Sequence, residues 1–147
     1  MVAQVISSPL LIDHSAWSRL GQSALPRDRA DAVFERMEAG ELVVCLPFLL
    51  EAGYSARAAD EHAALISRLQ KQPRATVDEH AEERAICAQG QLARVGHHRL
   101  APPDLIIAAL ADRDGLGILH YDADYDVIRE RTGLDFESVW LAPRGTL

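Results

Sequence analysis

Short apolar runs alternate with segments of helical periodicity along almost the whole chain. The run Leu10–Ile12 is bounded by polar residues and too short for a helix, so it predicts a buried strand. Residues 82–95 place apolar side chains three or four positions apart, which is the pattern of a helix packed on a sheet. Strands are predicted at 10–12, 41–46, 75–77, 117–121 and 136–141, and helices from 14 and at 27–39, 48–58, 60–70, 82–95, 105–111 and 127–131. This alternation predicts an α/β fold in which helices cover both faces of a central parallel sheet of four to five strands.

The length of 147 residues fits one domain, since single domains usually have about 100–150 residues. We therefore expect a single domain that spans residues 1–147. Residues 1–9 precede the first predicted strand and are either a loose N-terminal tail or a misassigned start. No apolar run approaches the ~20 residues of a membrane helix, and the first residues lack the basic start and long apolar stretch of a signal peptide. These features predict a cytoplasmic protein that does not act at a membrane.

Charge and residue usage exclude several kinds of nucleotide or nucleic-acid site. The formal net charge of -7 argues against a domain that coats nucleic acid, because such domains usually have a pI above about 9. Lys71 is the only lysine, so the Gly-Lys-Ser/Thr ending of a P-loop is missing. The glycines at 115–117 precede a predicted strand, whereas those of a dinucleotide site follow one. Cys45 and Cys87 lie in apolar patterns and are predicted to be buried free thiols.

Several carboxylates follow predicted strands or open predicted helices, and each has an ordinary explanation when taken alone. Asp13 and Asp104 lie near helix starts, where a carboxylate caps free backbone N–H groups. The acids between residues 122 and 126 fit a solvated loop equally well. Glu51 is harder to explain, because it lies in an apolar predicted helix and an unpaired buried carboxylate is costly.

Taken together, the acids predict a metal site. Ligands of open α/β sheets bind beyond the carboxyl ends of the strands, which is where Asp13, Asp122 and Asp124 fall. Like charges gathered at one edge raise one another's pKa values unless a cation lies between them. Carboxylates with few His or Cys partners suit Mg²⁺ or Mn²⁺ rather than zinc. We therefore expect a divalent metal at the carboxyl edge of the sheet.

Four stretches of the sequence resemble the signature motifs of a known family. They are LLIDHSAW around Asp13, LPFLLEAGYSAR around Glu51, PPDLIIAALA around Asp104 and ILHYDADYDVI around Asp122. Their order and spacing are similar to those of PIN domains, especially the VapC-type toxins of type II toxin–antitoxin systems. The resemblance extends from about residue 10 to residue 141. One departure is His120, which stands where the family usually has Thr or Ser.

The resemblance implies a metal-dependent endoribonuclease whose metal activates a water molecule and stabilises charge on the scissile phosphate. The implied catalytic residues are Asp13, Glu51, Asp104 and Asp122. The implied ligands of Mg²⁺ or Mn²⁺ are Asp13, Asp104, Asp122 and Asp124. Ser15 is expected to bond a carboxylate or a metal-bound water, and His120 to support the ligands or to add a pH-sensitive contact to substrate.

The resemblance also implies an RNA substrate and a protein partner. The family cuts structured RNA, often in a transfer or ribosomal RNA loop, where unpaired bases are accessible. Candidate contacts to RNA are Arg57, Arg94, His97, His98 and Arg99, which are explained as well by surface charge. VapC-type toxins are generally homodimers, and a small VapB-type antitoxin covers the acids in a heterotetramer or a larger complex. The apolar helices between residues 47 and 70 either leave a groove for its helix or simply form core.

Two rival interpretations and one question of substrate stay open at this point. A receiver-type phosphoacceptor domain also has an acidic magnesium pocket, but it needs a lysine beside that pocket, and Lys71 is predicted to end a distant helix. A PIN fold kept only as a binding or scaffold module is the second rival, which the presence of all four acids disfavours. DNA remains an alternative substrate to RNA, which a protein distinguishes by contacts to the 2′-hydroxyl.

Overall fold

The computed structural model describes residues 9–147, so residues 1–8, and with them most of the expected N-terminal tail, lie outside the described chain. Five strands form one parallel sheet in the order β3-β2-β1-β4-β5. They are β1 (Leu10–Ile12), β2 (Leu42–Cys45), β3 (Arg74–Ala75), β4 (Gly117–His120) and β5 (Glu137–Trp140). The predicted parallel sheet is confirmed, at the upper end of the expected strand number.

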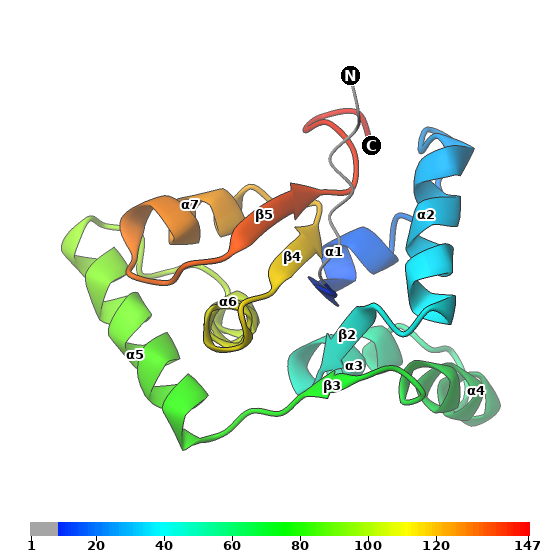
Figure 1. The fold of residues 1–147 in the computed structure, drawn as a ribbon, viewed down its shortest axis with the longest axis horizontal. Helices are drawn as coiled ribbons and strands as arrows, with labels where there is room; N and C mark the ends of the chain where they lie inside the picture. Colours follow the sequence, from blue (N-terminus) through cyan, green and yellow to red (C-terminus); the bar gives the residue numbers. More distant parts are fainter. Residues whose placement is uncertain (1–8) are drawn as a thin grey trace.

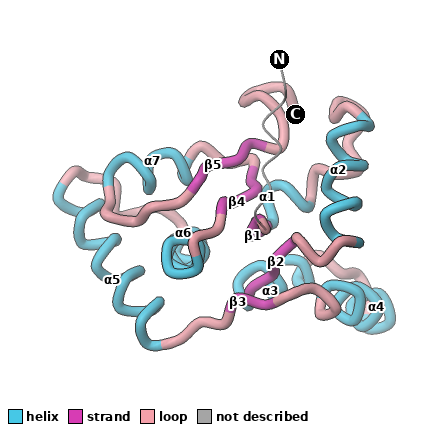
Figure 2. The backbone as a smooth tube through the Cα atoms, in the orientation of Figure 1, coloured by secondary structure: helices cyan, strands magenta, loops and turns pink. Residues whose placement is uncertain are grey.

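Helices lie on both sides of this sheet, as the alternating pattern predicts. They are α1 (His14–Trp17), α2 (Arg27–Glu38), α3 (Leu46–Tyr54), α4 (Ala59–Leu69), α5 (Glu79–Arg94), α6 (Pro102–Asp114) and α7 (Asp124–Arg131). Figure 1 shows α5, α6 and α7 gathered on one side, and α1, α2 and α4 on the other. Figure 2 shows the five strands enclosed between these two groups. In the described part of the chain, none of the helices combines the length and the hydropathy needed to cross a membrane.

The middle strand of the sheet is β1, and its two neighbours are β2 and β4. Leu10 lies opposite Leu42 on one side and opposite Gly117 on the other. The chain builds β2 and β3 outward on one side of β1, then returns to build β4 and β5 on the other. The direction of building reverses between β1 and β4, and the carboxyl ends of the strands at such a reversal are the usual ligand sites of open α/β sheets.

The glycines at 115 and 117 have structural roles in the turn that leads from α6 into β4. Gly115 follows the last residue of α6 with a φ of 64°, a left-handed conformation that favours glycine. At Gly117, a Cβ atom would lie 2.8 Å from the Leu10 side chain and 3.4 Å from the carbonyl oxygen of Glu137. The neighbouring strands therefore leave room for no side chain at this position.

Several element boundaries differ from the predicted ones for local reasons. The helix α3 ends at Tyr54 rather than at residue 58, so Arg57 lies beyond it. The helix α5 begins at Glu79, three residues early, because the Asp78 side chain accepts a hydrogen bond from the backbone N–H of Ala81. The prediction of two buried thiols is right for Cys45 and wrong for Cys87, which lies on the exposed face of α5.

Candidate metal centre

The carboxyl edge of the sheet brings together acids that are distant in the sequence. Asp13 directly follows β1, and Asp122 lies two residues beyond β4. Asp124 is the first residue of α7. Asp104 lies in the first turn of α6, which precedes the parallel strand β4 and so begins at the same edge at which that strand ends. The fold thus explains why the acids converge at the carboxyl ends of β1 and β4.

Three of these acids form a compact group. Asp104, Asp122 and Asp124 each offer a carboxylate oxygen, and these oxygens all lie within 4.8 Å of one another. Burial raises the pKa of Asp104 to about 7, followed in importance by the charges of Asp13, Asp122, Glu51 and Asp124. Burial and the charge of Asp122 also raise the pKa of Asp124. These three residues are called the acidic triad below.

Asp13 lies beside the acidic triad and is almost fully buried, with 3% of its surface exposed. Its Oδ2 accepts a hydrogen bond from the backbone N–H of Ser15 at 2.9 Å, so it caps α1 as capping alone would predict. Its Oδ1 accepts a second hydrogen bond, at 2.7 Å, from the hydroxyl of Tyr125. That hydroxyl also lies 3.3 Å from Oδ1 of Asp104. Asp13 is therefore both a helix cap and a neighbour of the acidic triad.

Glu51 lies at the outer rim of this cluster rather than in its centre. Its side chain is 38% exposed, and its Oε2 lies 3.9 Å from Nδ1 of His14. Burial, and next the charge of Asp13, raise the pKa of Glu51. The concern that Glu51 is an unpaired buried acid is wrong, because its face of α3 borders an open hollow lined also by His14, Leu50 and Tyr54.

The two supporting residues both contact the backbone that carries Asp122. The Ser15 hydroxyl accepts a hydrogen bond from the backbone N–H of Tyr121 at 2.9 Å. His120 is completely buried, and its Nδ1 accepts a hydrogen bond from the backbone N–H of Asp122 at 3.1 Å. Because of this burial, the idea that His120 contacts substrate is wrong, and its place behind the acids is the one the structure supports.

A chain of hydrogen bonds holds the His120 ring in position. Since Nδ1 accepts from the backbone, Nε2 carries the proton and lies 2.7 Å from Oγ of Ser138. The Ser138 hydroxyl in turn donates to Oδ1 of Asp126 at 2.6 Å, and the Trp140 indole donates to Oδ2 of the same acid at 3.0 Å. Both carboxylate oxygens of Asp126 therefore already accept hydrogen bonds from side chains of β5, and Asp126 does not belong to the acidic triad. Burial lowers the pKa of His120, which keeps the ring neutral.

Sequence reasoning missed Tyr125, whose side chain is fully buried beside the acids. An aromatic residue at the start of a helix is normally interpreted as core, and the ring of Tyr125 does pack between His120 and Phe136. The usable signal was its hydroxyl, because a buried tyrosine generally requires a hydrogen-bond partner. Its position directly after Asp124 placed those partners at the carboxyl edge.

The basic candidates are exposed, and they lie at helix ends and in the loop that precedes α6. Arg94 is the last residue of α5. His97, His98 and Arg99 lie in the loop that leads into α6 and hence toward Asp104. Arg57 lies just beyond α3, where its backbone N–H contacts Glu61. The structure thus places these side chains at the surface.

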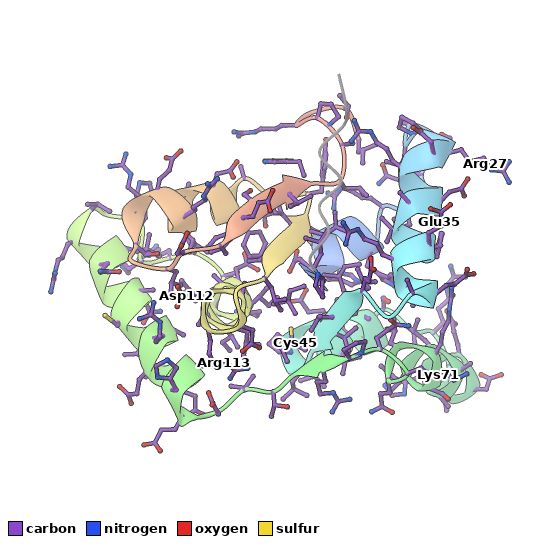
Figure 3. All side chains as sticks on the ribbon, viewed as in Figure 1. Arg27, Glu35, Cys45, Lys71, Asp112 and Arg113 are labelled. Atoms are coloured by element: carbon purple, nitrogen blue, oxygen red, sulfur yellow. The ribbon has the colours of Figure 1, made fainter. Side chains whose placement is uncertain are left out.

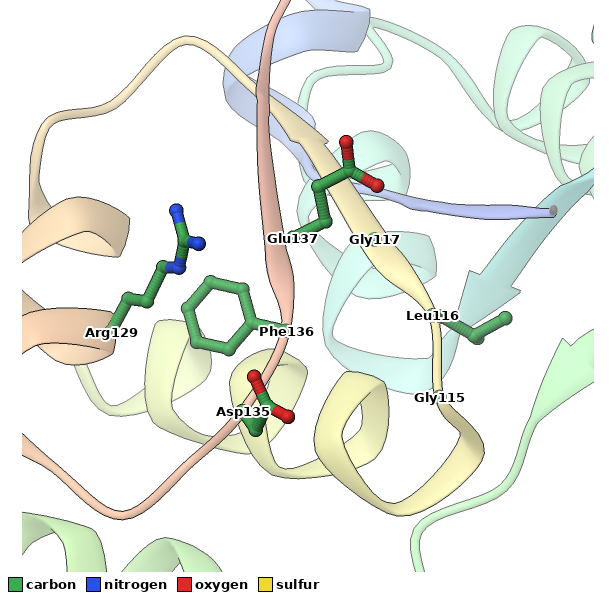
Figure 4. A pocket seen from close by; sticks show the side chains of 7 residues that line it. All are labelled: Gly115, Leu116, Gly117, Arg129, Asp135, Phe136 and Glu137. Atoms are coloured by element: carbon green, nitrogen blue, oxygen red, sulfur yellow. The ribbon is translucent and has the colours of Figure 1, made fainter. Parts of the chain in front are cut away.

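Two other features of the molecule lie away from the acids. Lys71 follows α4 and lines a hollow between α2 and α4 with Phe34 and Met37 (Figure 3). Because Lys71 is not beside the acidic triad, the receiver-type interpretation is wrong. A second hollow, lined by Gly117, Arg129 and Glu137 among others, lies at the amino ends of β4 and β5, the opposite edge of the sheet (Figure 4).

The side chains at the carboxyl edge fit a hard divalent cation. The acidic triad offers carboxylate oxygens alone, and Mg²⁺ and Mn²⁺ prefer such ligands. Burial, and next the charges of Asp13, Asp122, Glu51 and Asp124, raise the pKa of Asp104 to about 7, and a cation at this position would favour its charged form. His120 is turned away, since both of its ring nitrogens already contact Asp122 and Ser138. The arrangement does not resemble a zinc site.

Comparison with known proteins identifies the family. The model of the PIN domain matches residues 10–131, which contain all the acids described above. The chain belongs to the PIN-domain family. This PIN domain is 35% identical over 139 residues to ribonuclease VapC18 of Mycobacterium tuberculosis, covering 92% of this chain and 97% of that relative. It is 36% identical over 137 residues to ribonuclease VapC51 of the same organism, covering 93% and 96%.

Solved structures share the fold of this PIN domain. One is the DNA-bound VapBC of Salmonella typhimurium, with a TM-score of 0.70 and 16% identity over 92% of this chain and 99% of that chain. Another is VapBC-5 of Mycobacterium tuberculosis, with a TM-score of 0.60 and 21% identity over 90% of this chain and 99% of that chain. The resemblance to PIN domains of the VapC type is thereby confirmed.

Proposed function

We propose that this PIN domain is a Mg²⁺- or Mn²⁺-dependent endoribonuclease that acts as the toxin of a VapBC-type toxin–antitoxin system. The observation that carries the proposal is the acidic triad, with Asp13 beside it, at the carboxyl ends of β1 and β4. Relatives that match more than nine tenths of the chain are named ribonucleases, which supports the same activity. The substrate is structured RNA, cut in a transfer or ribosomal RNA loop.

In this proposal the acids at the carboxyl edge bind the metal, and Glu51 at the rim meets the substrate. The ligands are Asp13 and the acidic triad, and Glu51 stands at the rim beside Asp13. When bound, a divalent cation lowers the pKa of water and neutralises charge that builds on a phosphate. Because burial raises the pKa of Asp104 to about 7, metal binding would compete with a proton at this carboxyl near neutral pH.

The net charge of -7 means that RNA must be attracted locally. Arg94, His97 and Arg99, together with His98, are exposed around the start of α6 and are proposed to contact phosphates there. Arg57 is proposed to do so from the end of α3. Such contacts add affinity without selecting a sequence, because phosphates are common to every RNA.

The test is cleavage of total cellular RNA by the purified protein with Mg²⁺ or Mn²⁺. Wild type is compared with Asp13→Asn, with an EDTA control, and with Asp31→Asn, which removes an exposed acid from α2. Discrete fragments that need metal, disappear in Asp13→Asn and persist in Asp31→Asn support the proposal. Equal behaviour of wild type and Asp13→Asn would favour a scaffold module. Matched RNA and DNA loops, offered to the same proteins, distinguish the two nucleic acids.

The proposed partner is a VapB-type antitoxin that covers the acids. Support comes from α3, where Leu46, Leu50 and Tyr54 are 51%, 63% and 92% exposed beside Glu51. Large exposed apolar side chains that lie together mark interaction surfaces. A carboxylate cluster is also satisfied by a guanidinium, which an antitoxin tail is expected to supply. We further propose that the protein is a cytoplasmic homodimer, which forms a heterotetramer or a larger complex with the antitoxin. Light scattering of the protein alone and of its complex with the antitoxin checks these assembly states.

A further inference from the structure

The hydroxyl of Tyr125 lies between two acids that come from different elements. It is 2.7 Å from Oδ1 of Asp13, at the end of β1, and 3.3 Å from Oδ1 of Asp104, in the first turn of α6. Its own residue is the second of α7, directly after Asp124. One hydroxyl on α7, the helix that carries Asp124, thus contacts an acid at the end of β1 and an acid in α6.

The Tyr125 ring is held so that its hydroxyl has little freedom to move. The side chain is completely buried. The His120 ring lies 4.9 Å away, centre to centre, and the Phe136 ring packs edge-on at 6.4 Å. The start of α7 is fixed in turn, because the backbone N–H of Asp124 donates to Oδ1 of Asp122 at 2.9 Å. Packing from β4 and the segment before β5 therefore sets where the hydroxyl lies.

The hydroxyl also determines how Asp13 presents its oxygens. A tyrosine hydroxyl has one proton to donate, and the shorter distance assigns it to Oδ1 of Asp13. The other oxygen, Oδ2, accepts from the backbone N–H of Ser15. With one donor on each oxygen, the carboxylate is locked in one rotation. The ordinary pKa of a tyrosine hydroxyl is about 10, so the hydroxyl is a donor at neutral pH.

We propose that Tyr125 is a positioning residue of the metal centre, whose hydroxyl fixes the orientation of Asp13 beside Asp104. The inference rests on the proposed function only in taking these acids as metal ligands. A neutral hydrogen-bond donor suits this task, because it orients the carboxylate without competing with the metal for its charge, as a cationic side chain would. Groups behind metal ligands typically change metal affinity about 10- to 100-fold when they are removed.

The experiment is Mn²⁺ binding to wild type, Tyr125→Phe and Tyr121→Phe, measured by calorimetry and by the electron paramagnetic resonance spectrum of bound Mn²⁺. Tyr125→Phe keeps the buried ring and removes only the hydroxyl. Tyr121→Phe is the matched control, because that hydroxyl contacts the backbone N–H of Leu147 rather than an acid. We expect Tyr125→Phe to bind Mn²⁺ about 10- to 100-fold more weakly with an altered spectrum, and Tyr121→Phe to match wild type.

The possible outcomes distinguish a failure of the proposed metal centre from a failure of the positioning role of Tyr125. If wild type binds no Mn²⁺, the metal centre of the proposed function is wrong. If wild type and Tyr125→Phe bind Mn²⁺ equally and give the same spectrum, the positioning role alone is overturned, whatever happens to thermal stability. Should Tyr125→Phe fail to fold, the tyrosine ultraviolet spectrum of a Tyr54→Phe/Tyr121→Phe variant, in which Tyr125 is the remaining one of the three tyrosines, is recorded as Mn²⁺ is added. A change on binding supports the role of Tyr125, and an unchanged spectrum overturns it.

Discussion

Asp13 accepts a hydrogen bond from the backbone N–H of Ser15, so the first acid of the site is also the cap of the helix that follows it. The two oxygens of the carboxylate have different donors, since Tyr125 occupies the other one. This dual role determines how substitutions of Asp13 must be interpreted. An asparagine has one side-chain oxygen and keeps one of the two bonds, whereas an alanine keeps neither.

The first prediction compares two substitutions that remove the same charge. Asp13→Ala is expected to be less stable than Asp13→Asn by about 1 kcal/mol, the usual value of a side-chain helix cap. Both variants are expected to lose metal binding. The measurement is the free energy of unfolding in urea with EDTA present. Equal stability of the two variants would mean that the Ser15 contact contributes nothing in solution.

The second prediction concerns pH and the metal-free protein. The pKa of Asp104 is about 7 in the fold and near 3.8 in an unfolded chain. Between these values the folded protein keeps a proton that the unfolded chain has released, so the free energy of unfolding falls as pH rises from about 4 to about 7. The loss amounts to a few kcal/mol, because one pKa unit corresponds to about 1.4 kcal/mol.

The control for this prediction is Asp104→Asn, which cannot titrate at that position. The lowered pKa values of His14 and His120 act in the opposite direction, since their unfolded forms take up protons below about pH 6.5. Glu51 and Asp124, whose pKa values are raised, act like Asp104. All of these remain in both proteins. The free energy of unfolding of wild type, relative to that of Asp104→Asn, should therefore fall between about pH 4 and pH 7. Parallel curves of unfolding free energy against pH for the two proteins would contradict the prediction.

The third prediction concerns His120, the departure from the usual Thr or Ser of the family. His120→Phe keeps an aromatic ring in the buried space but leaves the backbone N–H of Asp122 and the Ser138 hydroxyl without this partner. We expect a loss of about 1–3 kcal/mol, which is the cost of an unsatisfied buried polar group. Urea unfolding in EDTA measures it, with the exposed His80→Phe as the control. If the two variants are equally stable, the His120 contacts do not support the Asp122 backbone.

The fold was largely predictable from the sequence because its signals are local. The uninterrupted apolar run at β1 and the spacing of Ala81, Ala85, Ala88 and Leu92 on α5 each specify one element, and these residues are buried as predicted. Boundaries were less predictable. The start of α5 depends on the Asp78 cap, and α7 begins at Asp124 because the carboxylate of Asp122 accepts its backbone N–H. Polar contacts of this kind leave no hydrophobic periodicity.

The acids of the site were predictable for a different reason. A parallel sheet places the ends of all its strands at one edge, so Asp13 and Asp122 must approach whatever the details of packing. The division of roles was not predictable, since it depends on distances. Asp126 resembles Asp124 in sequence, yet its carboxylate is bonded to Ser138 and Trp140. The role of Tyr125 was missed because the sequence pattern predicts that an aromatic ring is buried but does not give the hydrogen-bond partner of its hydroxyl.

The last prediction concerns the apolar surface of α3 and the proposed antitoxin. Leu50 is 63% exposed and lines hollows on both sides of the helix, one shared with Glu51 and the other with Ile66 of α4. The second hollow exists because α3 and α4 approach closely at Gly53, where a Cβ atom would lie 2.9 Å from Nε2 of His62. A partner helix that lies along this surface would bury Leu50 and reach the rim of the acids.

Leu50→Glu is therefore expected to weaken the complex with the proposed VapB-type antitoxin by about tenfold or more. A buried leucine contributes about 1.5–3 kcal/mol, and 1.4 kcal/mol corresponds to a factor of ten. Ile86→Glu is the matched control, because Ile86 is also 63% exposed but lies on α5. Calorimetric titration measures both affinities, with thermal unfolding and Mn²⁺ binding expected to stay unchanged. Equal affinities for the two variants would mean that the antitoxin binds elsewhere, because Leu50 lines the hollow that Glu51 borders, whereas Ile86 lies on α5.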